Sequence, residues 1–237
     1  MAQRTIEYQE GDTRLVGVMV TPEAAGPAPA VLIAHDWTGR NDIALQHAQR
    51  LAKQGYVGFA MDMYGDGRNG STVEEKAGLM APLREDRGLL MRRAAAGFEA
   101  MLAQPEVDRE RTAAIGFCFG GLVVLDLARS GANVGGVVSL HGFLDAPERA
   151  LCKPITAQVL VLHGYKDPMV QPPMLPVFEA EMHEAEVDFQ LHVYGRAMHA
   201  FTNPAAQNKD MGTVYDEVTA QRAMRTLDGF LADLFAK

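Results

Sequence analysis

The stretch TAAIGFCFGGLVVLDLAR, residues 112–129, decides the fold of this chain. Its first residues are small and apolar, as in a buried strand, and the residues from Leu122 onward predict a helix. Between them, Cys118 is flanked by Gly116 on one side and by Gly120 and Gly121 on the other. Glycines at these positions allow the backbone to fold back tightly from the strand into the helix. This is the pattern of a nucleophile elbow with cysteine as the presented residue.

Short apolar runs alternate with helical patterns on both sides of this turn. Such alternation predicts successive βα units and a mostly parallel central sheet with helices on both faces. Because no linker or repeat interrupts the alternation, we expect one domain over residues 1–237. The expected strands are Thr5–Gln9 and Arg14–Val20 as an antiparallel edge hairpin, then Ala30–His35, Val57–Asp62, Thr112–Gly116, Val134–Leu140, Gln158–His163 and Val187–Tyr194. The expected helices are Asp42–Gln54, Thr72–Leu83, Asp86–Leu102, Phe119–Arg129, Pro173–His183 and Thr213–Phe235.

The composition argues against several partner classes. The chain has 237 residues, 48% of them hydrophobic, and a formal net charge of −8. An acidic balance disfavours nucleic acid and anionic membranes, which attract basic surfaces. The N-terminal residues MAQRTIEYQEGD lack the apolar core of a signal peptide, so we expect a cytoplasmic protein without a membrane segment. Two cysteines, Cys118 and Cys152, are too few for a disulfide framework or a zinc site, and we expect no metal and no cofactor.

The position of Cys118 predicts a reactive thiol. At the start of a helix, the first free amides favour a thiolate and later an oxyanion. The alternative is a buried cysteine that only fills a glycine-rich turn. In elbow hydrolases the acid and the base follow the nucleophile in that order. His199 follows the last expected strand, in a loop that can reach the sheet edge, and it is the predicted base.

The other downstream histidines are interpreted as structural. His183 lies in an amphipathic helix and His192 inside a strand, whereas His141 and His163 each end a strand as His-Gly. The predicted acid is Asp167, just past the penultimate strand, where Pro168 restricts it to extended geometry. Two alternatives remain open for the acid. Asp145 follows the preceding strand, and Asp167 itself could form an ordinary Asx turn.

A hydrolase also needs N–H donors for the developing oxyanion. In elbow hydrolases one donor is the amide after the nucleophile, here Phe119, and the other comes from the loop after an early strand. That loop is His35-Asp36-Trp37-Thr38-Gly39, so Trp37 is the predicted second donor. Its indole is expected to line the substrate pocket, or else to cover the edge of the hydrophobic core.

Taken together, these motifs resemble the dienelactone hydrolase family of α/β hydrolases. They are Gly116-Phe-Cys-Phe-Gly-Gly121, the turn from His163 to Pro168, the His199-Ala-Phe201 loop and an early strand that ends in His-acid-x-x-Gly. The resemblance implies an α/β-hydrolase fold and a Cys118–His199–Asp167 triad with Phe119 and Trp37 as amide donors. It also implies that Asp36, where well-known members have Glu, contacts and activates the resting thiol. Asn203 stands where those members carry an Arg that holds a substrate carboxylate.

The predicted function is hydrolysis of small carboxylic esters or lactones through an acyl-enzyme, by a monomer or a homodimer. A metal-independent phosphotriesterase side activity is a further hypothesis. The residues predicted to line the substrate pocket are Met63, Tyr64, Arg68, Met80, Leu83, Phe143, Phe201 and Asn203. One alternative is a non-catalytic thiol sensor or interaction protein on the same fold. A nucleotide-binding oxidoreductase is disfavoured, because Cys118 stands where G-x-G-x-x-G needs its second glycine.

Overall fold

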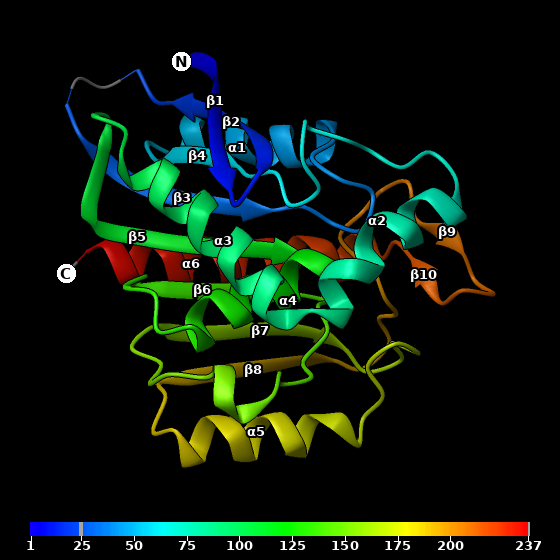
Figure 1. The fold of residues 1–237 in the computed structure, drawn as a ribbon. Coiled ribbons are helices and arrows are strands. Elements are labelled where there is room, and N and C mark those ends of the chain that lie inside the picture. Colours follow the sequence, from blue (N-terminus) through cyan, green and yellow to red (C-terminus); the bar gives the residue numbers. More distant parts are fainter. Residues whose placement is uncertain (24–25, 237) are drawn as a thin grey trace.

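The computed structural model describes residues 1–23 and 26–236, so Ala24, Ala25 and Lys237 of the expected domain lie outside the described residues. Strands and helices largely alternate along the chain (Figure 1). The strands are β1 (Ala2–Glu10), β2 (Thr13–Thr21), β3 (Ala28–Ala34), β4 (Val57–Ala60), β5 (Val107–Phe117), β6 (Gly136–Leu140), β7 (Gln158–Gly164), β8 (Phe189–Tyr194), β9 (Gln207–Asn208) and β10 (Thr213–Val214). The helices are α1 (Asp42–Lys53), α2 (Val73–Glu85), α3 (Arg87–Leu102), α4 (Phe119–Arg129), α5 (Met174–Glu184) and α6 (Glu217–Phe235), with a short 3₁₀ helix at Arg149–Leu151.

Eight strands form one sheet in the order β1-β2-β4-β3-β5-β6-β7-β8. β1 and β2 are antiparallel to each other, β2 is antiparallel to β4, and the remaining neighbours are parallel. The predicted α/β-hydrolase architecture, a mostly parallel sheet with an antiparallel edge hairpin, is confirmed. Because β3, β5, β6, β7 and β8 run in the same direction, the loops that follow them gather at one edge of the sheet.

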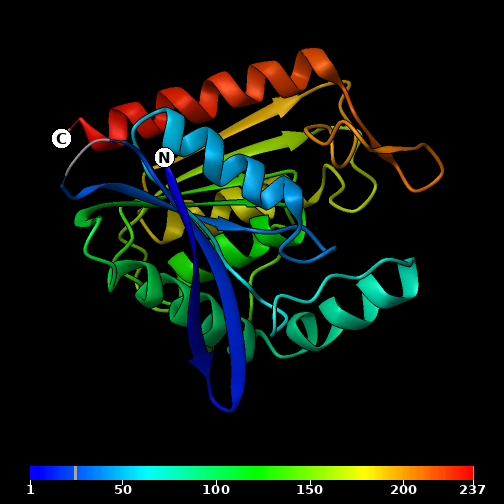
Figure 2. The same ribbon diagram turned by 90° about the horizontal axis from the view of Figure 1, so that it is seen from above.

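Helices cover both faces of the sheet. α1 and α6 lie on one face, and α3, α4 and α5 lie on the other (Figure 2). Side chains alternate between the two cores: Val31 and Ile33 of β3 pack with α1 and α6, whereas Ala30 and Leu32 belong to the opposite core. Burial on both faces explains why the central strands have nearly continuous apolar sequences.

The last helix begins later than the sequence predicts. Thr213–Val214 forms β10, which pairs with β9 in a small separate sheet. α6 starts after Asp216, whose carboxylate accepts a hydrogen bond from the Thr219 amide at 2.8 Å. This side chain satisfies one of the free amides of the first turn, and so it sets the boundary of the helix.

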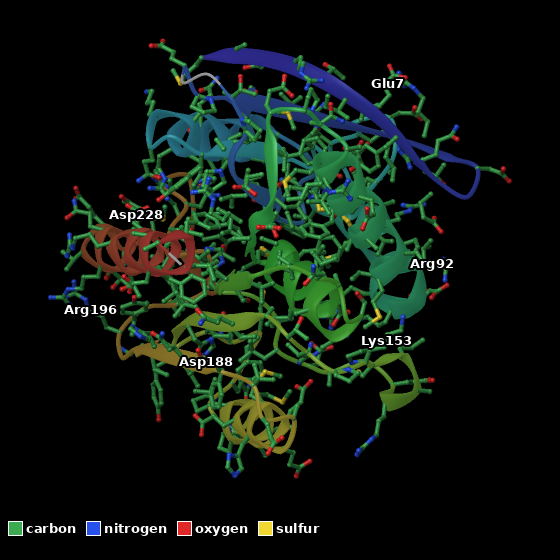
Figure 3. The ribbon with its side chains drawn as sticks, turned by 90° about the vertical axis from the view of Figure 1, so that its left-hand side faces the viewer. Glu7, Arg92, Lys153, Asp188, Arg196 and Asp228 are labelled. Atoms are coloured by element: carbon green, nitrogen blue, oxygen red, sulfur yellow. The ribbon has the colours of Figure 1, made fainter. Side chains whose placement is uncertain are left out.

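Charged side chains of both signs lie on the outside of the molecule. Figure 3 labels six of them, of which Asp228 is half-buried and pairs with Arg50 at 2.7 Å, and they are Glu7, Arg92, Lys153, Asp188, Arg196 and Asp228. Among the described residues, no helix combines the length and the apolar character that crossing a membrane requires. Five of the buried polar residues lie at or after the ends of β3, β6, β7 and β8, namely His35, His141, His163, Asp167 and His199.

Candidate active site

Cys118 occupies a strained turn between β5 and α4. Its backbone has φ 54° and ψ −116°, a conformation that is costly for a residue with a side chain. A Cβ atom on Gly116 would overlap the backbone of Gly120, and one on Gly120 would overlap the carbonyl of Ala34. The Cys118 amide donates to the Leu140 carbonyl at 3.1 Å. The two glycines therefore permit the turn, and the hydrogen bond to the end of β6 holds it.

His199 and Asp167 form a buried pair at the same edge of the sheet. His199 Nδ1 lies 2.7 Å from Asp167 Oδ2, and each residue is 1% exposed. The other carboxylate oxygen accepts hydrogen bonds from the amides of Met169 (2.8 Å) and Val170 (3.3 Å). Because the carboxylate is fixed in this way, Nδ1 of His199 donates to it. Nε2 is then the nitrogen available for proton transfer.

The charge state of His199 depends on its two neighbours. Burial by itself lowers the pKa of this imidazole, but a thiolate at Cys118 and the carboxylate of Asp167 outweigh burial and raise the pKa to about 10. Nε2 of His199 is buried and has no hydrogen-bond partner among the described residues, and the nearby Cys118 sulfur raises the pKa mainly through its charge. An imidazolium between these two groups is therefore stabilised when His199 accepts the thiol proton.

The two predicted oxyanion donors come from neighbouring strand ends. Phe119 is the first residue of α4, where backbone amides have no partner within the helix. Trp37 follows β3 and lines the same cavity as Cys118 and His199. The Trp37 carbonyl accepts a hydrogen bond from the Tyr64 hydroxyl at 3.0 Å, which fixes this loop. Since β3 pairs with β5, both donor residues lie at the same part of the sheet edge.

Asp36 lines the cavity, but its carboxylate is engaged within its own loop. Oδ1 accepts a hydrogen bond from the Thr38 amide at 2.8 Å, which closes an Asx turn. Among the described residues no hydrogen bond joins this carboxylate to the Cys118 sulfur. The activating role that the family resemblance implies for Asp36 therefore stays a prediction.

A cavity of about 510 Å³ adjoins Cys118, His199 and Trp37. Of the residues predicted for the substrate pocket, Met80, Phe143 and Asn203 line it. Apolar side chains such as Ile43 and Met169 alternate in the wall with polar ones such as Asn41 and Thr202, and a concave site with both kinds of group suits a small organic molecule.

Five other predicted pocket residues do not line this cavity, namely Met63, Tyr64, Arg68, Leu83 and Phe201. All of these except Arg68 are buried in the hydrophobic cores. The loop after β4 turns inward because Asp62 Oδ1 accepts hydrogen bonds from the amides of Tyr64 (2.9 Å) and Gly65 (3.0 Å). The Arg68 guanidinium donates to the carbonyls of Tyr64 and Gly65, so it stabilises the loop in which it lies.

Helix α2 forms one wall of the cavity through Lys76 and Met80. Lys76 Nζ lies 5.5 Å from the centroid of the Trp37 ring, and the guanidinium of Arg84 lies 4.4 Å from that of Phe143. Such cation–π contacts are worth about 0.5–1 kcal/mol at exposed sites. Sequence reasoning missed Lys76, because no motif marks a contact between segments so far apart in the chain.

Two histidines that sequence reasoning did not assign to the pocket also line the cavity. His47 of α1 stacks on Phe117 with ring centroids 4.2 Å apart, and His141 Nε2 lies 2.7 Å from Thr202 Oγ1. Burial lowers the pKa of both imidazoles, so both are neutral near pH 7. The His-Gly that ends β6 is a signal that could have identified His141, since β6 ends beside Cys118. His47 lies inside a helix and carries no such signal.

Asp145, the alternative acid, lies in a different set of contacts. Its two carboxylate oxygens accept hydrogen bonds from Arg84 (3.2 Å) and Arg87 (2.8 Å). The carboxylate that contacts His199 is that of Asp167.

Comparison with known proteins identifies relatives along most of the chain. The model of the dienelactone hydrolase family matches residues 15–235. The solved structure of a dienelactone hydrolase-like promiscuous phosphotriesterase from metagenomic libraries is 35% identical, covers 99% of this chain and 98% of that chain, and has a TM-score of 0.92. A structure named m3DLH is 38% identical, with coverage of 99% and 98% and a TM-score of 0.91.

A curated relative also aligns with most of the chain. A putative carboxymethylenebutenolidase of Yersinia pestis is 26% identical over 234 residues, which cover 93% of this chain and 84% of that protein. With a family match over residues 15–235 and an α/β-hydrolase sheet that carries the cysteine elbow, this chain belongs to the dienelactone hydrolase family.

Proposed function

We propose that this chain hydrolyses small carboxylic esters or lactones through an acyl-enzyme on Cys118. Family membership supports the broader activity, that of a hydrolase with a small-molecule substrate. The observation that carries the finer proposal is the buried His199–Asp167 pair, whose Nε2 atom is left available beside Cys118.

The proposed reaction has two steps that share one base. His199 Nε2 takes the thiol proton as the Cys118 sulfur attacks the carbonyl carbon, and the amides of Phe119 and Trp37 hold the oxyanion. When the carbonyl re-forms, the C–O bond breaks and His199 gives its proton to the leaving alcohol. Water, deprotonated by His199, then attacks the thioester, and the C–S bond breaks to release the acid and restore the thiol. Asp167 orients the imidazole in both steps.

A non-catalytic thiol sensor is the alternative function on this fold. A sensor needs a reactive cysteine, but it does not need a base that a buried carboxylate orients. The hydrogen bond between His199 and Asp167 therefore favours catalysis. Turnover of a chromogenic ester by the wild-type protein separates the two functions.

The charge of the cavity wall bears on the substrate class. Asn203 Oδ1 accepts a hydrogen bond from the Ala205 amide at 2.9 Å, so its NH₂ group is what remains to offer to a ligand. The half-buried Lys76 is a cation on the wall, and it lies over the Trp37 ring. We expect uncharged arylesters and lactones to be preferred, because no arginine stands at position 203.

The same groups suit a phosphorus centre as a side activity. We propose slow hydrolysis of activated phosphotriesters, in which Cys118 attacks phosphorus, the aryl oxide leaves, and water then breaks the P–S bond. A thiol with the usual pKa of about 8.5 leaves phosphorus more readily than an alcohol does. The similarity to a promiscuous phosphotriesterase, 35% identical over 99% of this chain, supports this proposal.

Replacing Cys118 with Ala is expected to lower ester turnover by at least about 1,000-fold, because the acyl group has no point of attachment. The matched control is Cys152→Ala, which removes the other, partly exposed thiol and should leave turnover near wild type. Turnover and the thermal midpoint are measured for both variants. Turnover near wild type in Cys118→Ala would show that the nucleophile is another group.

Substitutions of the acid and the base test the triad. His199→Asn should cost about as much as the loss of Cys118, because members of a catalytic unit act non-additively, and Asp167→Asn should leave more residual activity. Asp145→Asn is the control, since it weakens contacts with Arg84 and Arg87. It should lower the thermal midpoint and leave kcat near that of the wild type. A larger loss of kcat in Asp145→Asn than in Asp167→Asn would contradict the assignment of the acid.

A matched pair of esters, one neutral and one bearing a carboxylate, tests the charge preference. We expect kcat/KM to favour the neutral ester, because a missing charge-assisted hydrogen bond costs about 1.5–3 kcal/mol. A tenfold preference for the anion would refute this expectation. Loss of that anion preference in Lys76→Met would then identify Lys76 as the cation responsible.

An aryl dialkyl phosphate incubated with the enzyme in excess EDTA tests the side activity. The expected result is slow release of many equivalents of aryl alcohol per enzyme, at a rate that EDTA does not change. Release of one equivalent followed by arrest, with a phosphoryl adduct on Cys118 in the mass spectrum, would mean that the thiol is only inhibited.

A further inference from the structure

His35 is a buried polar residue that the proposed mechanism does not use. It is 1% exposed and follows β3. Its Nδ1 lies 2.6 Å from the Asp36 carbonyl oxygen, and its Nε2 lies 3.2 Å from the Met63 amide nitrogen. A carbonyl only accepts and an amide N–H only donates, so His35 is neutral and carries its proton on Nδ1. Burial lowers the pKa of His35, which favours the same neutral form.

The carbonyl that His35 holds belongs to the same peptide group as the Trp37 amide. A trans peptide is planar, and its C=O and N–H point in opposite directions. Donation from His35, with a second hydrogen bond from the Gly39 amide at 3.3 Å, therefore fixes the direction of the Trp37 N–H. If this peptide rotated by half a turn, a carbonyl oxygen would replace the N–H and would repel an oxyanion.

Tyr64 holds the next peptide and also contacts the other donor residue. Its hydroxyl donates to the Trp37 carbonyl at 3.0 Å. Its ring packs edge-on to His35 at 4.7 Å and parallel to Phe119 at 5.9 Å between centroids. Burial and the negative charges of Cys118 and Asp36 raise the pKa of Tyr64, so the phenol keeps its proton. Tyr64 thus touches both residues whose amides are the proposed oxyanion donors.

We propose that His35 and Tyr64 are positioning residues that aim the Trp37 amide at the oxyanion. Neither side chain lines the cavity, so neither meets the substrate, and both act through the peptides on either side of Trp37. This inference rests on the proposed function, because it assigns how one of the two donors is held in place.

Ester cleavage and alkylation both use the Cys118 sulfur. Comparing their rates distinguishes positioning of the oxyanion donor from an effect on the nucleophile itself. Ester cleavage builds an oxyanion. Alkylation by iodoacetamide forms a C–S bond, expels iodide and builds none. The chain has two cysteines, so the experiment uses a Cys152→Ala background in which Cys118 is the remaining thiol. A defect confined to the oxyanion donor slows the ester reaction and leaves the alkylation rate unchanged.

Tyr64→Phe is expected to lower kcat about tenfold, with KM and the alkylation rate within about twofold of the background. Removing an oxyanion donor outright costs about 10²–10³ in kcat, and loosening one costs less. Tyr8→Phe is the matched control. It also removes the hydroxyl of a tyrosine that packs against the core, here the half-buried Tyr8, which donates to the Asp62 carbonyl at 3.0 Å, and it should lower only the thermal midpoint.

Substitution of His35 tests the donated proton directly. Asn can place its amide N–H where Nδ1 lies, whereas Leu fills the space without a donor. We expect His35→Leu to lower kcat about 100-fold and His35→Asn to recover at least about tenfold of that loss. Equal kcat in the two variants would overturn the role of the Nδ1 proton.

The remaining outcomes are also decisive. A parallel fall of ester turnover and alkylation in Tyr64→Phe would mean that the residue acts on the nucleophile, and an unchanged kcat would mean that it positions nothing. If the wild-type protein turns over no ester, the proposed function fails first and the positioning role falls with it. If the wild type is active and the variants keep its kcat, the positioning role alone is overturned.

Discussion

The close approach of helix α4 to the end of strand β3 sets the spacing of the groups at the site. There is no room for a Cβ atom at Gly120, because the carbonyls of Ala34 and His35 occupy that space. The first turn of α4 therefore lies directly against the segment that leads into Trp37. Cys118, the first amide of α4 and the Trp37 loop converge for this reason, and any larger residue at Gly120 would separate them.

A network of buried charges supports the loop after β6, which forms part of the cavity wall. Arg129 and Asp126 are almost fully buried, and Arg129 also pairs with Glu181 at 2.6 Å, while Arg87 pairs with Asp126 at 2.6 Å. Burying such charges is costly, and pairing of every member offsets the cost. The same guanidinium groups donate to the backbone carbonyl of Asp145. The network thus joins α3, α4 and α5 to the loop after β6, which carries Phe143 into the cavity wall.

The sequence is most informative where local backbone chemistry decides the structure. The elbow at Cys118 and the alternation of strands and helices depend on glycine positions and on periodicity, and both were predictable. The start of α6 at Glu217 was not, because it depends on the capping side chain of Asp216 and on the pairing of β9 with β10. The start of β5 at Val107 likewise depends on its pairing with β3.

The candidate site was predictable only in part, for a related reason. The order of Cys118, Asp167 and His199 follows from where strands end, but the choice between Asp167 and Asp145 depends on tertiary partners. In the structure, arginines engage Asp145 and the histidine engages Asp167. The pocket residues depend on which way each loop turns, and nothing in the local sequence shows that Asp62 draws the loop after β4 inward.

The two sides of the cavity are supported in different ways. The proposed triad and its proposed donor amides belong to strand ends and to the first turn of α4, which pack against the central sheet. The facing wall belongs to α2, a helix whose buried residue is Leu83 and whose links to Trp37 and Phe143 are two cation–π contacts. Substitutions along α2 can therefore change the shape of the cavity while the hydrogen bond between His199 and Asp167 beside Cys118 is preserved. In evolutionary terms, the fold separates the helix that shapes the cavity from the groups of the proposed triad, so the cavity can diverge between relatives without rebuilding the proposed catalyst.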